Sequence, residues 1–404
     1  MPNEKRVSVI WLTGTAWAAL LVFAATSALT PVSLEHIGAD LDIGFDLKGL
    51  LAALRSGVLA ISTLTVGYLA DRCGKRWFLG GGMCVIALGM LWVGQSGAYI
   101  GLVGGMMAVG VGLGCVEALA SPLIAELHPD RVETHMNVLH AFFPAGLLVA
   151  SPLVGLALDV GVPWRLPFTL TAIPAVLVGV MFAVGRYPAR AGDVQSSPLA
   201  IRRILATPMF WLLAVAMMLT AGAEGSLILW SPSFIQQEYQ TSALLGGAGL
   251  MVFSAAMAAG RFGTGAAARS VPLPRIMLGL IFLCAAVTLC LVLVRSFWAS
   301  LGSLLMAGLF IACFWPSILT IATRRIAAGS STLLAMLAVA GIAGFGVMPW
   351  AVGQLAAHRD LRFGLGIVPA ALVVAGVVLV VVFALDGTRL RGSFPGSPTS
   401  DPHD

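Results

Sequence analysis

Two glutamates occupy the interior of long apolar stretches, where an ionisable side chain is unfavourable. Of the 18 acidic residues, only Glu117 and Glu224 lie well inside such stretches. An ionisable residue at membrane depth marks a functional site by default. A carboxyl group that alternates between a buried and a hydrated environment can take up and release a proton. We therefore interpret both as proton-coupling or substrate-binding groups; the alternative is a structural carboxyl group that joins helices through a hydrogen bond.

Small and polar residues share one helical face with Glu117. Gly110, Gly114 and Ser121 stand at spacings from Glu117 that place all four on one side of a helix. Small residues at such positions let helices pack closely. We therefore expect Glu117 to face protein or a cavity rather than lipid, and Ser121 to share its site.

Histidine and tryptophan supply further candidate groups. His140 follows Asn137 by three residues near the start of an apolar stretch, where it serves either as a proton relay or as a hydrogen-bonded helix-end residue. Trp17, Trp230 and Trp315 present faces that stack on sugar rings or apolar solutes, although tryptophan near helix ends also forms the interfacial belt. Of the three, Trp315 is our preferred stacking residue.

Two arginines, Arg55 and Arg261, also lie in apolar stretches, near opposite ends of their predicted helices. A long basic side chain at such a place reaches the membrane surface with its charged end while its stem stays in apolar surroundings. We interpret both arginines in this way.

The elements that must position these residues are membrane helices. Hydrophobic residues make up 59% and charged residues 10% of the 404-residue chain, whereas soluble domains hold about 25% charged residues. This composition excludes a water-soluble enzyme and a disordered chain, and apolar stretches of 20 or more residues exclude a membrane β-barrel. The predicted fold is an all-α polytopic membrane protein with twelve transmembrane helices, at 8–32, 49–70, 78–95, 100–124, 137–158, 165–184, 208–231, 244–267, 275–294, 297–322, 330–355 and 364–385.

The basic residues predict the orientation of these helices. With the N-terminus in the cytoplasm, 16 of the 23 Lys and Arg residues fall in cytoplasmic segments and 6 lie at or near the opposite side. This bias places both termini in the cytoplasm, and we expect the bacterial inner membrane. The net charge of +5 is thereby explained without a nucleic-acid partner.

Neither a cofactor nor catalysis is indicated. The six cysteines have no CxxC spacing, so we expect buried thiols rather than disulfides or a metal site. A nucleotide-binding loop and a catalytic cluster of His, Asp and Ser are both lacking in the sequence, so we expect no enzyme activity and a monomer whose partners are a small solute, protons and lipid.

Weak repeats divide the chain into two halves. The segment 30–33 resembles 231–233, 151–155 resembles 348–353, and 121–122 resembles 315–316, at offsets near half the chain length. Two parallel six-helix halves with a substrate site between them form a transporter architecture. We expect an N-terminal half at 1–184, a cytoplasmic linker at 185–207, a C-terminal half at 208–386 and a disordered tail at 387–404.

The turn between the second and third predicted helices carries the most specific motif. Residues 67–77 read Gly-Tyr-Leu-Ala-Asp-Arg-Cys-Gly-Lys-Arg-Trp and closely resemble a motif of the major facilitator superfamily. Glycine permits close packing or a tight turn, and the aspartate can pair with an arginine or a helix N-terminus to latch a gate. The predicted gating residues are Gly67, Asp71, Arg72, Gly74, Lys75 and Arg76. The matching turn at 263–269 has Ala267 in place of the aspartate.

Within that superfamily, four segments resemble fucose–proton symporters. These segments are 114–124, 136–146, 222–230 and 314–318. The resemblance implies proton-coupled uptake of a monosaccharide-like solute, with Glu117 in binding or coupling. It also leads us to expect an acid in the first helix, yet the first acid there is Glu35, at the outer end.

Two other functions stay open. Residues 146–155 partly resemble a motif of drug–proton antiporters, which makes a proton-coupled exporter of apolar compounds the alternative. A non-transporting membrane sensor is the remote alternative, because such a protein has no need of a latch motif.

Overall fold

A computed structural model describes residues 2–187, 198–326 and 330–385, and nearly all of them are helical. In this part of the chain, twelve segments are long and apolar enough to cross a membrane. They comprise α1 (Pro2–Leu41), α2 (Phe45–Cys73), α3 (Lys75–Gln95), α4 (Tyr99–Leu127), α5 (Val132–Asp159), α6 (Arg165–Val184), α8 (Pro208–Tyr239), α9 (Ala243–Ala267), α10 (Leu273–Leu293), α11 (Phe297–Ile311) with α12 (Phe314–Arg325), α13 (Ser330–His358), and α14 (Leu361–Leu365) with α15 (Ile367–Leu385).

All twelve predicted helices are confirmed, but two of them continue well past their predicted C-terminal ends. The first continues past Pro31 to Leu41 and the seventh past Pro232 to Tyr239. A proline in a membrane helix is tolerated when neighbouring helices satisfy the freed backbone groups. The start of this extension of α1 lies in the protein interior, because Leu34 and Ile37 are fully buried.

Other predicted segments differ in detail. The tenth predicted helix is interrupted between α11 and α12, and the twelfth between α14 and α15. Within the predicted linker, residues 198–205 form the short helix α7 (Pro198–Leu205), and a short 3₁₀ helix, η1 (Pro129–Arg131), joins α4 to α5. The predicted tail at 387–404 lies outside the described residues. Cys73 and Cys84 are exposed, whereas we expected buried thiols.

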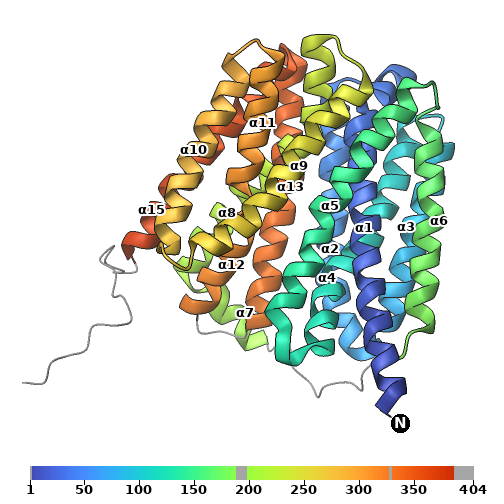
Figure 1. Cartoon of the computed structure of the whole chain (residues 1–404), viewed down its shortest axis with the longest axis vertical. Helices are drawn as coiled ribbons and strands as arrows, with labels where there is room; N and C mark the ends of the chain where they lie inside the picture. Colours follow the sequence, from blue (N-terminus) through green and yellow to red (C-terminus); the bar gives the residue numbers. More distant parts are fainter. Residues whose placement is uncertain (1, 188–197, 327–329, 386–404) are drawn as a thin grey trace, which may run out of the picture.

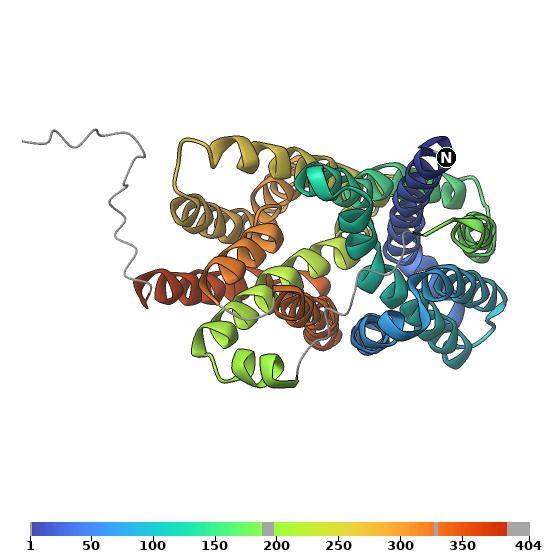
Figure 2. The same ribbon diagram turned by 90° about the horizontal axis from the view of Figure 1, so that it is seen from below.

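The helices form two six-helix groups that lie side by side (Figures 1 and 2). One group holds α1–α6 and the other α8–α15. Between the groups, α2 packs along α13 and α5 packs along α9, while α1 crosses α8. Both α1 and α8 start at the end of the bundle where the N-terminus lies, which we call the N-terminal end; we call the opposite end the distal end.

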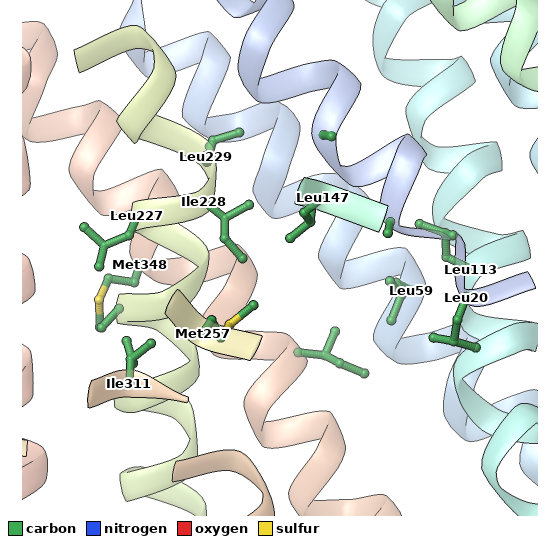
Figure 3. Packing of buried hydrophobic residues seen from close by; sticks show 14 of the residues in the cluster. Leu20, Leu59, Leu113, Leu147, Leu227, Ile228, Leu229, Met257, Ile311 and Met348 are labelled. Atoms are coloured by element: carbon green, nitrogen blue, oxygen red, sulfur yellow. The ribbon is translucent and has the colours of Figure 1, made fainter. Parts of the chain in front are cut away.

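Apolar side chains fill the middle of the bundle and also cover its outside. Figure 3 shows buried members from both groups, among them Leu20, Leu59 and Leu113 from α1, α2 and α4, and Leu227, Ile311 and Met348 from α8, α11 and α13. Large apolar side chains are exposed along the outer helices as well, such as Ile100 at 78% and Leu177 at 59%. Apolar surface of this extent suits contact with lipid rather than water, and the protein is an integral membrane protein.

An arginine ties together three helix ends at the distal end of the first group. Arg165, at the start of α6, forms an ion pair with Asp40 of α1 at 2.7 Å. Its Nε also donates to the carbonyl oxygen of Ser96, which follows α3, at 2.9 Å. The guanidinium therefore neutralises a carboxylate and satisfies a carbonyl group at a helix C-terminus, where a cation is favoured.

The second group repeats this arrangement. Arg362 of α14 forms an ion pair with Glu238 of α8 at 2.8 Å and donates to three carbonyl oxygens at the end of α10, those of Leu291, Val292 and Val294. Arg362, Glu238 and Val294 lie 197 or 198 residues after Arg165, Asp40 and Ser96, their counterparts in the first group. The internal repeat therefore extends to a side-chain network that we name the arginine staple of each half.

Replacing Arg362 with alanine tests the contribution of a staple to stability. Arg362→Ala leaves Glu238 and the carbonyl groups of α10 without their cation, so we expect a loss of about 2 kcal/mol of folding free energy. The measurement is the unfolding midpoint of the purified protein in detergent. Arg359→Ala, which removes an exposed arginine three residues away, serves as the control, and an equal loss in both variants would contradict the staple.

Candidate functional site

Side chains from both halves meet in the part of the bundle that is nearer its N-terminal end. Ser121 of α4 hydrogen-bonds His140 of α5, with Oγ and Nε2 3.3 Å apart. From the other half, Arg261 of α9 donates through Nη1 to the backbone oxygen of His140 at 3.0 Å. The cluster therefore spans the boundary between the halves.

Glu224 joins this cluster through electrostatics. Its side chain on α8 is only 5% exposed, and it interacts electrostatically with Arg261. No ion pair within 4 Å connects the two among the described residues. The snorkelling interpretation of Arg261 is wrong, because its guanidinium reaches across to the other half instead of the membrane surface. The signal was present in the sequence as an arginine inside a span.

Glu117 lies one helical turn before Ser121 on α4. It is partly exposed, and the described residues provide it with no hydrogen bond or ion pair. A Cβ atom added to Gly110 would stand 2.6 Å from the Arg55 carbonyl oxygen, and one added to Gly114 would stand 2.5 Å from Ser62 Cβ. The predicted close packing of this face therefore occurs against α2. Asn137, one turn before His140 on α5, is exposed.

The three candidate tryptophans have different surroundings. Trp17 stacks on Phe142 of α5, with ring centroids 5.3 Å apart, and its indole nitrogen is buried without a partner. Trp230 is fully buried and donates to the Pro349 oxygen at 3.0 Å, so its faces are covered in this conformation. Trp315 is partly exposed and has an edge contact with Phe345. Of the three, Trp17 is the one that contacts α5 near His140, because Phe142 lies two residues after His140.

At the distal end, the halves are joined through a glutamate on α1. Glu35 accepts from Lys48 of α2 at 3.1 Å with one carboxylate oxygen and from Gln237 of α8 at 2.6 Å with the other. Lys48 is 5% exposed, and its ammonium lies against Gly38, where a Cβ atom would clash with it. Gln237 therefore connects the second half to a carboxylate that the first half holds in place.

A second contact closes the distal end between α5 and α9. Asp159, the last residue of α5, accepts from the backbone nitrogens of Ala243 and Leu244 at 2.9 and 3.2 Å. These are the first residues of α9, so Asp159 caps a helix N-terminus of the other half. Gly155 allows this approach, since a Cβ atom there would stand 2.5 Å from the Ala243 oxygen.

The motif turn lies at the N-terminal end. Gly74 has a φ of 94°, which favours glycine and lets α2 end directly before α3. Lys75 forms an ion pair with Glu126 at the end of α4, a partner that the sequence analysis did not identify, and Arg76 lies over the Trp77 ring at 5.5 Å. Nothing lies within 4 Å of a Cβ atom added to Gly67, so no close helix packing occurs there in this conformation. The side chains of Asp71 and Arg72 lie outside the described part of the structure.

A histidine pair lies beside this end. His128, just after α4, stacks on His135 of α5 with ring centroids 3.6 Å apart, and its Nε2 is 2.8 Å from Thr13 Oγ1 of α1. Burial, followed by the nearby His135, holds the pKa of His128 below its ordinary value. His128 joins three helices by stacking and hydrogen bonding, and the lowered pKa favours its uncharged form.

Metal binding finds no support in the described residues, which contain no group of three His, Cys, Asp or Glu side chains arranged to hold an ion.

The sequence matches a known family: the profile of the Major Facilitator Superfamily covers residues 15–332. The chain belongs to the Major Facilitator Superfamily.

Relatives of this superfamily member include a myo-inositol transporter and a spinster homologue. The chain is 28% identical to myo-inositol transporter 2 of Schizosaccharomyces pombe over 43% of its length, and 27% identical to protein spinster homolog 1 of Bos taurus over 50%. The matched parts cover 32% and 41% of these two proteins, so the chain spans less than half of either relative.

Solved structures show the same fold over nearly the whole chain. A bacterial homologue of the lysosomal transporter spinster, in an inward-facing and occupied conformation, has a TM-score of 0.76 and 15% identity, with 95% of this chain and 97% of that one covered. The fucose:proton symporter of E. coli has a TM-score of 0.66 and 16% identity, with 93% and 99% covered. The predicted fold and superfamily are confirmed.

The Asp159 cap gives a test of distal closure in this superfamily member. Asp159→Ala removes an N-terminal cap of about 1 kcal/mol that joins the two halves, so we expect about fivefold more opening of the distal end. The measurement is the rate at which a membrane-impermeant maleimide labels a Ser231→Cys variant, since Ser231 is only 2% exposed. Asp360→Ala is the matched control, because Asp360 caps α14 within one half. Equal labelling in both variants would contradict the role of Asp159.

Proposed function

We propose that this chain is a secondary active transporter that moves a small, sugar-like solute by alternating access, coupled to proton symport. The observation that carries the proposal is the pair of glutamates in the membrane-spanning region, one in each half. Neither Glu117 nor Glu224 forms an ion pair with the described residues, and both lie near the cluster of Ser121, His140 and Arg261. Carboxyl groups placed in this way can exchange protons as the site opens to either side.

The contacts between the halves support a transport cycle with two orientations. At the distal end, Glu35 and Asp159 join the halves by hydrogen bonds. At the opposite end, Gly67 has no close neighbour and Lys75 is paired within its own half. We propose that the distal end faces outward from the bacterial inner membrane and is closed in this conformation, and that the motif turn closes the cytoplasmic end in the other orientation.

Relatives support a sugar or polyol as the solute. One matching relative is a myo-inositol transporter, and one structural neighbour is a fucose:proton symporter. The site adds hydrogen-bonding groups suited to hydroxyls, namely Ser121, His140 and the unpartnered indole nitrogen of Trp17. The protein works in this proposal as a monomer and without a cofactor.

Export of apolar compounds is a second candidate. An apolar recess of about 310 Å³ lies between α5, α9 and α11, and Leu148, Met251, Ala255 and Leu305 are among its lining residues. Its place along the α5–α9 boundary would allow an apolar compound to enter from lipid. Proton-driven efflux of a dye such as ethidium, without accumulation of sugars, would favour this function.

Neutralising Glu117 tests proton coupling. In proteoliposomes with an imposed pH gradient, we expect the unsubstituted protein to accumulate at least one labelled probe among glucose, myo-inositol and glucuronate. We expect Glu117→Gln to abolish accumulation while exchange persists in part, because the amide cannot carry a proton. Asp42→Asn removes an exposed carboxylate and is the control. Proton-driven accumulation by Glu117→Gln would contradict the coupling role.

Asp71 tests the motif turn as a latch. Asp71→Asn removes the charge that is proposed to hold the cytoplasmic end closed, so we expect reduced flux at an unchanged unfolding midpoint. The measurement is the initial rate of probe exchange in proteoliposomes. Asp130→Asn, at the exposed η1 helix, is the control. A rate equal to that of the control would show that the latch is absent.

A further inference from the structure

Arg261 has hydrogen-bonding capacity that the protein itself does not use. Its Nη1 donates to the His140 backbone oxygen. Its Nε is buried and lacks a partner, and Nη2 forms no hydrogen bond or ion pair with the described residues. These two nitrogens form one edge of the guanidinium, and that edge matches the two oxygens of a carboxylate in a bidentate pair.

An unpartnered buried donor needs an explanation, because leaving it without an acceptor is unfavourable. Arg261 also carries a full charge inside a span, where such a charge is normally paired. Glu224 interacts with it electrostatically but remains beyond ion-pair distance. The arginine is thus held by one backbone contact, while the edge suited to an anion has no hydrogen-bond partner among the described residues.

Groups that can hydrogen-bond hydroxyls lie in the N-terminal half, next to the backbone oxygen of His140 that Arg261 contacts. Ser121 and the His140 ring lie at hydrogen-bonding distance from each other. The Trp17 ring stacks on Phe142, two residues after His140, and its nitrogen has no partner. A solute between the halves would therefore meet a cation from α9 and neutral polar groups from α1, α4 and α5.

We propose that the transported solute is a polyhydroxy carboxylate, such as a sugar acid, whose carboxylate binds the Nε–Nη2 edge of Arg261. The hydroxyls of the solute face Ser121, His140 and Trp17. This inference rests on the proposed transport function and narrows its solute from neutral sugars to acidic ones. Arg261 would then select the solute by charge.

Binding of two probes to the purified full-length protein tests this assignment. D-Glucuronate and D-glucose differ in a carboxylate, and calorimetric titration in detergent measures the affinity for each. We expect glucuronate to bind at least about 10-fold more tightly than glucose. Equal or tighter binding of glucose, or no binding of glucuronate, would overturn the assignment.

Variants of Arg261 separate a direct role from a structural one. We expect Arg261→Gln to lower the affinity for glucuronate by about 10-fold or more and to leave that for glucose unchanged, and Arg261→Lys to give an intermediate affinity. Arg269→Gln removes an exposed arginine just after α9 and is the control. An equal loss for both probes in Arg261→Gln would show that the residue only supports the fold, and would overturn the proposal.

Transport measurements distinguish this proposal from the function on which it rests. Proton-driven accumulation of glucose but not of glucuronate would retain the symport function and overturn the acidic solute. Binding of glucuronate that depends on Arg261, without accumulation under any pH gradient, would retain the site and overturn the symport function.

Discussion

The cost of an unpaired charge in hydrocarbon governs where this chain places its few charged side chains. At the distal end, Arg165 and Arg362 are each paired with an acid and with carbonyl groups at a helix end. The contrast lies deeper in the bundle, where Glu117, Glu224 and Arg261 form no ion pair with described residues. The charges that the fold leaves without direct partners are the ones that we propose to bind protons and solutes.

Contacts within a half and contacts between halves differ in kind. Each arginine staple joins three helix ends of its own half with an ion pair and hydrogen bonds. At the distal end, the hydrogen bonds between the halves come from single side chains, among them Asp159, Gln237 and Gln354. When these hydrogen bonds between the halves break, the freed groups can bond water instead, since a helix N-terminus and an amide are both polar. The halves are therefore suited to move as rigid bodies that separate along one boundary.

Hydropathy predicted all twelve helices because a span needs only length and apolar composition. The ends of α1 and α8 were missed because Leu34 and its neighbours are held by tertiary contacts, which no local pattern records. The glutamates were found as rare acids in apolar stretches. The reach of Arg261 to His140 was not, because the contact joins positions 121 residues apart, and the repeated staples also escaped notice because their members lie far apart within each half.

Electrostatic interactions couple the charge states of Glu224, Arg261 and the proposed anionic solute. An ionised Glu224 beside Arg261 leaves this part of the site neutral, and so does a protonated Glu224 beside Arg261 with a bound carboxylate. A site with both anions or with neither carries a net charge, which weak screening makes unfavourable. Two other titratable groups, His140 and Cys284, face the pair. As long as their own charges stay constant, the states with both anions or with neither remain unfavourable. Binding of the anion and binding of the proton then favour each other, and such mutual dependence is what symport requires.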